Sequence, residues 1–424
     1  MTNINRTFVA SLMVLLSSTE ACTLDFLTDD EKKQLDSMAL PTQLPPSPSN
    51  SFADNPAAAQ LGQQFFFDKR FSGPLLEHSE LGQEGDMNTM SCATCHDPAR
   101  GGADIRALGG TSLGAAWTGR NSPTVRNAAH SPWAFWDGRR DSLWSQALGP
   151  IEGDVEMNSG RLQTARLIFE KYREPYEKLF GPMPGMEDVA RFPTEGKPGM
   201  PAFDEMAAAD KTAINRVYAN FGKAIEAYER KLVDKSSPFD RFLAGDQNAM
   251  SAQAVRGARL FVGKAACNEC HSGPMMADGK FHNHGVPQHG NKIPAIDRGR
   301  TDGIPQLLAT EFNTAGQYSD MNKADRWNGL HVVDADLGAF KTPTLRNISK
   351  TGPYMHTGGF ANLWDVINWY NLAAGTDGFS GHREAASLVP LKLTNEEMAD
   401  LVEFMKALDG DPLPESLTEA PPLP

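Results

Sequence analysis

The sequence predicts a mainly helical protein with two domains and long loops. Apolar side chains recur at the spacing of one helix face in several segments, most clearly over 207–232, whereas the alternating runs typical of strands are few. The pattern C-x-x-C-H occurs twice, at Cys92–His96 and at Cys267–His271, once in each half of the chain. A length of 424 residues allows two or three domains. We therefore expect helical domains over residues 57–234 and 235–411, each built around one motif.

The C-x-x-C-H pattern is the attachment sequence of a c-type haem. One helical turn brings both thiols of a motif within reach of the two vinyl groups of a haem, and the histidine that follows can ligate the iron. A redox-active dithiol or half of a zinc site are the alternatives. The first does not require the histidine, and the second requires further ligands at each motif. We expect two covalently bound haem c groups, attached through Cys92, Cys95, Cys267 and Cys270 and ligated by His96 and His271.

The N-terminus has the features of an export signal. Arg6 precedes an apolar run over 8–16, which is too short to span a bilayer and suits the core of a signal peptide over residues 1–21. Cys22 follows, and the pattern is compatible either with simple cleavage or with a lipoprotein anchored through Cys22. Because c-type haem is attached outside the bacterial cytoplasm, we expect a periplasmic protein, with or without a lipid anchor.

The rest of the chain alternates helical segments with segments rich in glycine and proline. Residues 22–56 end in a proline-rich run and are expected to form an extended tether. The tail over 412–424 is expected to be disordered. Loops are expected over 101–119, 181–203 and 273–302, where no helical period is visible. Helices are expected over 55–67, 142–148, 161–179, 207–232, 251–262, 363–371 and 395–407.

Acidic residues outnumber basic residues. The formal net charge of −13 argues against nucleic acid as a partner and favours a basic electron-transfer protein or a basic face on a protein substrate. Four of the five cysteines belong to the two haem motifs, which leaves no pair for a disulfide. Cysteine content therefore says little about the redox compartment, and haem attachment says more.

Further motifs occur in a fixed order along the chain. They are residues 91–96, Gly-Arg-Asn-Ser-Pro-Thr-Val-Arg-Asn at 119–127, Phe-Trp-Asp-Gly-Arg at 135–139, residues 267–271, Phe-Lys-Thr-Pro-Thr-Leu-Arg-Asn at 340–347 and Gly-Pro-Tyr-Met-His at 352–356. Over residues 57–408 the chain resembles the bacterial di-haem cytochrome c peroxidase superfamily, which includes the MauG-type enzymes. The resemblance implies two cytochrome c-like helical domains with one haem each and a calcium ion between them. It also implies that the N-terminal haem reacts with peroxide and the C-terminal haem stores and relays electrons.

The resemblance assigns roles around the first haem. Trp136 matches the tryptophan between the two haems, where an indole shortens the electron-transfer path; the alternative is a tryptophan packed in a core beside a turn. Gln146 and Glu156 match the glutamine and glutamate over the peroxide site. A glutamate near the iron can take a proton from the near oxygen of H2O2 and return it to the leaving oxygen, while a glutamine can orient the peroxide. From the sequence alone, Glu156 could instead be a surface acid near Glu152 and Asp154.

The resemblance also implies a calcium site at the positions of Asn121, Thr351 and Pro353. The asparagine would supply a side-chain oxygen, and the other two residues would supply backbone carbonyls. Oxygen ligands completed by water suit Ca2+. Without the resemblance, nothing at these three positions indicates a metal.

Two positions differ from the peroxidases of this family that need reductive activation. The first lies in the loop after the first haem motif, where those enzymes carry a distal histidine and this chain has Ala115. His130, which belongs to a different motif, is the only nearby substitute. The resemblance therefore implies a five-coordinate N-terminal haem with an open distal face.

The second position lies fourteen residues after His356, where the peroxidases carry a methionine ligand and MauG-type enzymes a tyrosine. This chain has Tyr370 there. A phenolate is a hard anionic ligand, so it favours an enzyme that holds two oxidising equivalents across both haems, whereas a thioether favours reduced iron. The alternative is that Tyr370 packs on a helix face and Met355 or Met398 is the ligand.

Three functions follow from these alternatives. A MauG-like enzyme would use H2O2 to oxidise tryptophan on a partner protein, as Ala115 and Tyr370 imply. A cytochrome c peroxidase would reduce H2O2 to water with electrons from a small cytochrome or cupredoxin. A di-haem electron carrier would have two six-coordinate haems and no distal acid, so Ala115 with Glu156 argues against it. MauG-type enzymes pass oxidising equivalents through a surface tryptophan whose position here is Ala265, which leaves the exit residue open among Trp144, Trp327 and Trp369.

Overall fold

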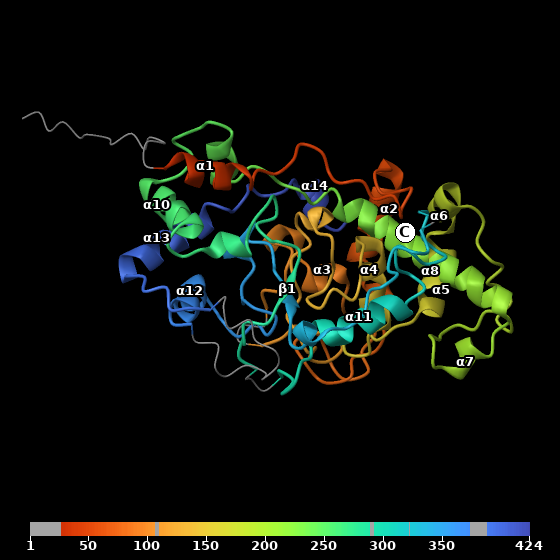
Figure 1. The fold of residues 1–424 in the computed structure, drawn as a ribbon. Coiled ribbons are helices and arrows are strands. Elements are labelled where there is room, and N and C mark those ends of the chain that lie inside the picture. Colours follow the sequence, from red (N-terminus) through yellow and green to blue (C-terminus); the bar gives the residue numbers. More distant parts are fainter. Residues whose placement is uncertain (1–26, 107–109, 289–291, 322, 374–387) are drawn as a thin grey trace, which may run out of the picture.

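The computed structural model describes residues 27–106, 110–288, 292–321, 323–373 and 388–424 (Figure 1). The expected signal peptide and Cys22 lie outside the described residues. Helices dominate, and within the described ranges the named strands are two short ones, β1 (Phe281–His282) and β2 (Phe340–Lys341), paired antiparallel. The mainly helical fold with long loops is therefore confirmed. Among the described helices, none combines the length and the apolar character needed to cross a membrane.

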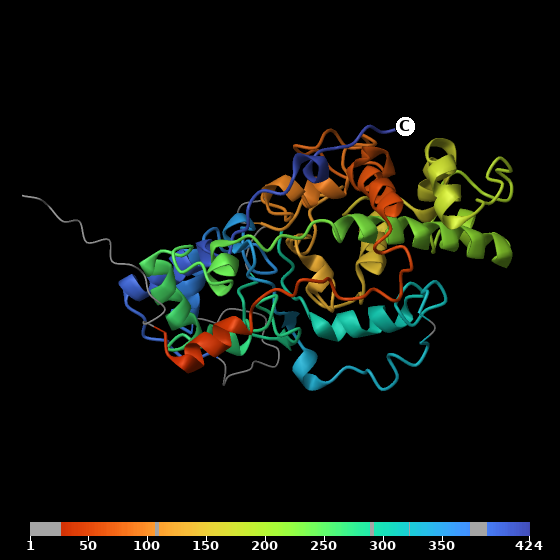
Figure 2. The same ribbon diagram turned by 90° about the horizontal axis from the view of Figure 1, so that it is seen from above.

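The first domain is built on α8 (Ala208–Glu229), with α2 (Pro56–Phe67) and α4 (Leu143–Glu152) packed against it (Figure 2). Gly62 lets α2 approach closely, because a Cβ at this position would lie 1.8 Å from the carbonyl oxygen of Ala224. The crossing buries a cluster of aromatic rings that includes three stacked or edge-on phenylalanines, Phe65, Phe71 and Phe221. The other helices of this domain are α3 (Cys92–Cys95), α5 (Arg161–Lys171), α6 (Arg173–Phe180) and α7 (Pro201–Asp204).

The helix expected over 161–179 is interrupted at Tyr172. The backbone of Tyr172 leaves the helical region at φ −123° and ψ 13°, and α6 begins at the next residue. The Tyr172 side chain is fully buried, and its hydroxyl donates a hydrogen bond to Asp68 at 2.7 Å. The break thus coincides with the residue whose phenol satisfies a buried carboxylate, which the helical period of the sequence does not reveal.

The second domain repeats the close helix crossing. α10 (Ala252–Val262) packs against α13 (Asn395–Lys406), and a Cβ at Gly257 would lie 2.0 Å from the carbonyl oxygen of Asp400. α12 (Leu363–Asn371) lies on α13. α9 (Pro238–Leu243) opens this half of the sequence, and α11 (Arg300–Ala309) lies beside the first domain, where Gly303 faces the backbone of Asp137 (Figure 2).

The two ends of the chain are exchanged between the domains. α1 (Asp29–Asp36) packs against α10, and Leu35 is buried in the core of the second domain. At the other end, α14 (Glu415–Thr418) lies on the first domain, where Leu417 joins the core. Within the described residues, α1 therefore interrupts the expected extended tether, and the tail expected to be disordered contains α14. A capping box between Thr28 and Glu31 starts α1, and in the tail Leu413 and Leu417 both pack against the core of the first domain.

An internal repeat extends beyond the haem motifs, at a constant separation of 220 residues. Asn127 and Asn347 both adopt left-handed backbone, with φ of 58° and 60°, and each backbone N–H bonds a carbonyl just after the main helix of its domain. Tight turns follow, closed by the backbone bridges Ala134 to Arg140 and Tyr354 to Phe360, and then α4 and α12 begin. The two halves are thus more alike in structure than the sequence outside the haem motifs indicates.

Candidate active site

A cavity of about 1020 Å3 lies between the two haem motifs. His96 from the first domain and Cys270 and His271 from the second contribute to its walls, and Trp136 lines the same cavity. The proline-rich segment 41–46 also lines it. One continuous space therefore serves both motifs.

Each proximal histidine is held by a backbone carbonyl. The Nδ1 atom of His96 lies 3.4 Å from the carbonyl oxygen of Gly102, and that of His271 lies 2.9 Å from the carbonyl oxygen of Met276. Burial lowers the pKa of both imidazoles, which favours their neutral form. With the proton on Nδ1, Nε2 keeps its lone pair for a metal.

The four motif cysteines form no disulfide with one another, so each sulfur is available to bond a haem vinyl group. The short helix α3 starts at Ser91, whose backbone N–H donates to Thr94 Oγ1 at 2.9 Å, and this turn sets the two thiols of the first motif one helical turn apart.

Lys341 adds a half-buried cation to the cavity. Burial lowers the pKa of its ammonium to about 8, and its Nζ donates to the carbonyl oxygen of Thr342 at 3.3 Å. Within the described ranges no carboxylate forms an ion pair with it. A half-buried cation favours an anionic group at its side, such as a haem propionate. The thiols, the held imidazoles and this cation fit two haem c groups in one cavity.

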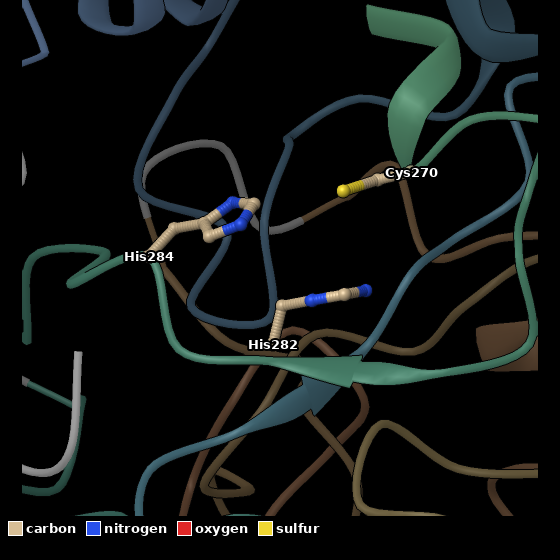
Figure 3. Close-up of side chains that lie close together, drawn as sticks. All are labelled: Cys270, His282 and His284. Atoms are coloured by element: carbon tan, nitrogen blue, oxygen red, sulfur yellow. The ribbon is translucent and has the colours of Figure 1, made fainter. Parts of the chain in front are cut away.

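Cys270, His282 and His284 converge on one side of the cavity (Figure 3), with ligating atoms within 4.8 Å of one another. Such a trio could hold a metal ion if the sulfur were a thiolate. Cys270 is the second cysteine of the haem motif, however, and a thioether sulfur is a poor ligand. We therefore assign this cluster to the wall of the second haem site rather than to a separate metal centre.

Gln146 and Glu156 line the same cavity as His96. α4 carries Gln146, and the turn after α4 is held by a hydrogen bond from the Glu156 backbone N–H to Gly153 at 3.1 Å. Burial raises the pKa of the Glu156 carboxyl, although Arg139 and Arg140 oppose the shift. A carboxyl with a raised pKa can both accept and return a proton nearer neutral pH.

Ala115 lies directly behind Glu156. Its backbone N–H donates to the Glu156 carbonyl oxygen at 2.7 Å, while its methyl group is buried in the first core and contributes nothing to the cavity wall. His130 lines the cavity, and burial with the charges of Arg346 and Arg230 lowers its pKa.

Trp136 joins the two domains at the cavity wall. Its Nε1–H donates to the carbonyl oxygen of Asn121 at 2.8 Å, and its own carbonyl oxygen accepts from the backbone N–H of Lys341 at 2.7 Å. The ring centroid lies 6.2 Å from that of His356 in an edge-on arrangement. The indole is thus fixed by contacts to both halves of the chain.

Tyr370 reaches the cavity from α12. Its hydroxyl lies 3.4 Å from Nδ1 of His284, and burial raises the pKa of the phenol. Of the two rival ligands, Met355 also lines the cavity. Met398 is instead packed in the second core.

The three residues of the implied calcium site lie near one another at the cavity wall. The Asn121 side chain donates from Nδ2 to the Pro353 carbonyl oxygen at 2.9 Å, and its Oδ1 accepts from the Ser112 hydroxyl at 3.1 Å. Both the hydroxyl and the backbone N–H of Thr351 donate to the Ile348 carbonyl. In this orientation Asn121 offers an amide nitrogen to Pro353, so the residues as they lie do not fit a cation.

Sequence reasoning gave no role to several residues that line the cavity. Glu229, at the end of α8, has a pKa raised to about 8 by burial, and it lies close enough to Cys92 to shift the pKa of that thiol. Its signal in the sequence is an acid on the apolar face of a long helix. Lys341 stands inside a quoted motif, but a lysine there carries no sign of burial. His284 has no motif around it.

The chain is similar to known proteins in both sequence and structure. A family model described as di-haem cytochrome c peroxidase matches residues 56–248. The chain is 35% identical to cytochrome-c peroxidase IdrP1 of Denitromonas iodatirespirans, over 86% of this chain and 85% of that protein. It is 31% identical to methylamine utilization protein MauG of Methylorubrum extorquens, over 86% of this chain and 82% of that protein. Among solved structures, it resembles a MauG-like protein associated with microbial copper homeostasis, with a TM-score of 0.60 and 26% identity over 90% of this chain and 97% of that one.

These relatives are matched over most of their length as well as most of this chain, and they carry both the peroxidase and the MauG names. The family of c-type cytochromes to which they belong agrees with the two haem motifs and the single cavity between them. The resemblance stated from the sequence motifs is confirmed. The chain belongs to the di-haem cytochrome c peroxidase and MauG family, and it is a haem c-containing oxidoreductase of the peroxidase type.

Proposed function

We propose that this enzyme is MauG-like: it would use H2O2 at the haem held by His96, where Ala115 offers no second ligand, and oxidise tryptophan on a partner protein. Haem groups held by His96 and by His271 with Tyr370 would supply the redox chemistry when bound. Trp136 couples the two sites. Under the same proposal the protein works in the periplasm, with or without a lipid anchor at Cys22.

The observation that carries the proposal is the position of Tyr370. Its phenol enters the cavity beside Cys267 and Cys270, from a helix that is itself packed on the second core. A hard anionic ligand stabilises an oxidised metal centre better than a thioether does. This supports a second haem that keeps oxidising charge rather than one that stores an electron.

Glu156 and Gln146 supply the proton chemistry on the peroxide side. We assign Glu156 the role of taking the proton from the near oxygen of H2O2 and delivering it to the leaving oxygen, which departs as water. The raised pKa of the buried carboxyl suits this double role, since transfer is most efficient when the pKa lies near the working pH. Gln146 would orient the peroxide by hydrogen bonding.

The test is to add H2O2 to the as-isolated diferric protein and to follow its absorption spectrum. The proposal expects loss of the ferric signal and a near-infrared charge-resonance band without prior reduction. Turnover that requires one-electron reduction beforehand would contradict it. Replacing Tyr370 by phenylalanine should then change the low-spin haem spectrum.

A second candidate is reduction of H2O2 to water with electrons from a small cytochrome or cupredoxin. The observation in its favour is that the 35% identical relative is named a cytochrome-c peroxidase. The same spectroscopic experiment separates the two candidates, because this one expects activation by reduction.

The calcium ion implied by the family resemblance stays part of the proposal. It requires the Asn121 amide to turn over, so that Oδ1 rather than Nδ2 faces the Pro353 carbonyl. Metal analysis of the purified protein before and after chelation tests it, with about one calcium per chain expected.

A further inference from the structure

A folded partner protein cannot enter a cavity of about 1020 Å3. Electrons must therefore cross the protein between the cavity wall and the surface. Tryptophan is well suited to carry them, because its large π-system is oxidised more readily than aliphatic side chains. The question is which indole connects the wall with the surface.

Two of the candidates named from the sequence do not reach the surface. Trp144 is fully buried against α8, with its Nε1–H donating to Ser49 Oγ at 3.1 Å, and Trp369 is 6% exposed. Trp364 is 38% exposed, but it does not line the cavity, and among the described rings none stacks on it. None of these three tryptophans therefore connects the cavity wall with the surface.

Trp133 and Trp327 form a pair that does connect them. Trp133 lines the cavity, three residues before Trp136 on the same turn. Its ring centroid lies 5.3 Å from that of Trp327, with the planes 34° apart. Trp327 is half-buried and belongs to the segment between α11 and β2, which runs along the outer edge of the molecule below α11 in Figure 2.

We propose that electrons from a protein partner enter the haem cavity through Trp327 and then Trp133. This inference rests on the proposed function, in which a partner protein is oxidised. It applies equally to the second candidate, because in both cases electrons move from the partner toward the haems.

The charges around the pair favour the oxidised state on the outer ring. The buried guanidinium of Arg300 lies 4.6 Å from the centroid of Trp133, so positive charge on that ring is disfavoured. Trp327 donates from Nε1 to the buried carboxylate of Asp141 at 3.1 Å, which stabilises positive charge on its indole and can accept its proton. Arg326 also lies over Trp327, at 4.7 Å, but it is exposed to solvent, which screens its charge.

The electron balance is complete. Each H2O2 takes two electrons and two protons and becomes two waters, and the two electrons leave the partner one at a time. Without a partner, the indole of Trp327 supplies them itself: it loses two electrons and two protons and gains oxygen from water. Hydroxylated Trp327 is then the product that records the path.

The test uses the haem-loaded full chain without partner, treated with one equivalent of H2O2 at a time, followed by mass spectrometry of its peptides. We expect oxygen addition to concentrate at Trp327 and to exceed that at Trp364, although Trp364 is the more exposed of the two to peroxide in solution. In Trp133→Phe, oxidation of Trp327 per haem oxidised should fall about tenfold, because the inner ring of the pair no longer carries the charge. Trp364→Phe is the matched control and should leave the Trp327 yield unchanged.

A second variant keeps the inference testable if Trp133→Phe alters folding. In Trp327→Phe, the oxidised haem spectrum should persist about tenfold longer than in the parent chain. Equal oxidation of Trp327 with and without Trp133, or a yield at Trp327 no higher than at Trp364, would overturn the path while leaving the peroxide chemistry intact. Absence of any haem response to peroxide would overturn the proposed function, and the path with it.

Discussion

The two haem domains share one backbone frame and differ where it faces the cavity. Thr124 and Thr344, which are 220 residues apart, make the same kind of hydrogen bond. The Thr124 hydroxyl donates to the Gly101 carbonyl oxygen and the Thr344 hydroxyl to that of Met275, and each acceptor lies just after the haem-motif histidine of its domain. The helices that follow differ at one decisive position. α4 presents Pro150 to the cavity where α12 presents Tyr370. A proline side chain has no ligating atom, whereas a phenol has one.

This difference teaches how one repeated frame can give two unequal sites. The residues that fix the frame are the asparagines and glycines of the turns, and they are the same in both domains. The residues that decide the chemistry project from that frame into the cavity. Asp234 links the two copies, since it accepts from Arg126 at 2.7 Å and from Asn347 at 3.1 Å. A change in one domain frame is therefore coupled to the other through this carboxylate.

The largest expected effect comes from removing Glu156, the acid that lines the cavity on the side of the first haem motif. In Glu156→Gln, the rate of the haem spectral change with H2O2 should fall about 10²–10⁴-fold, because the glutamine cannot take a proton. The base is the carboxylate form and burial raises the pKa of this carboxyl, so the parent rate should fall as the pH drops through that raised value. Stopped-flow absorption against pH measures both effects.

The control for Glu156→Gln is Asp154→Asn, two residues earlier, where the carboxylate is exposed and pairs with Lys197. It should leave the rate and its pH dependence unchanged. A pH profile that survives in Glu156→Gln would assign the proton transfer to another group.

The helix crossings test whether the two domains are also alike in packing. Gly62→Ala and Gly257→Ala would each place a methyl carbon against a carbonyl oxygen of the facing helix. Because both obstacles are backbone, each change should lower the free energy of unfolding by about 1–3 kcal/mol. Urea denaturation of the haem-loaded variants measures the loss. Gly185→Ala, whose Cβ would meet just a side-chain oxygen at 3.5 Å, is the control and should change stability by less than about 0.5 kcal/mol.

How far the sequence predicts the fold depends on whether a signal is local. α2 starts at the Asn55 cap with proline at its first turn, as its sequence predicts, because the cap and the helix are adjacent. α11 escaped prediction because Gly303 and Pro305 interrupt its pattern, although Gly303 permits contact with the Asp137 backbone. The exchange of the termini could not be predicted, since Leu35 and Leu417 meet their partners across hundreds of residues.

The residues of the candidate site also separate into those with a local sequence signal and those without one. Covalent attachment fixes the spacing of Cys92, Cys95 and His96, so the sequence alone indicates the first haem. Lys341 and the Trp133–Trp327 pair acquire their meaning from burial and from neighbours distant in sequence, which no motif encodes. The calcium residues are a third case, because the motif matches while the Asn121 amide points its nitrogen at the expected site.

Tyr370→Phe sharpens the comparison by making the second site resemble the first. Without the phenol, the C-terminal haem should lose its low-spin signature, and the near-infrared band after H2O2 should weaken by about tenfold, equivalent to about 1.4 kcal/mol. Electron paramagnetic resonance and near-infrared absorption follow the two changes. Tyr354→Phe, which also removes a phenol from the cavity lining of this domain, should leave both signals as they are. An unchanged spectrum in Tyr370→Phe would mean that Tyr370 is not a haem ligand, and Met355 would then be the rival ligand to test.

The smallest expected effect concerns the exchanged C-terminus, which makes the first domain depend on residues from the end of the chain. Buried Gln63 on α2 donates from Nε2 to the Ser416 carbonyl oxygen at 2.8 Å. Gln63→Ala removes this bond and leaves the Ser416 carbonyl oxygen without its donor. The free energy of unfolding should therefore fall by about 0.5–1.5 kcal/mol. Its neighbour Gln64 makes a similar bond to Pro422 at an exposed position, where water can replace the amide, and Gln64→Ala should cost less than about 0.5 kcal/mol. Urea denaturation distinguishes the two variants, and equal losses would mean that α14 rests on the first domain without stabilising it.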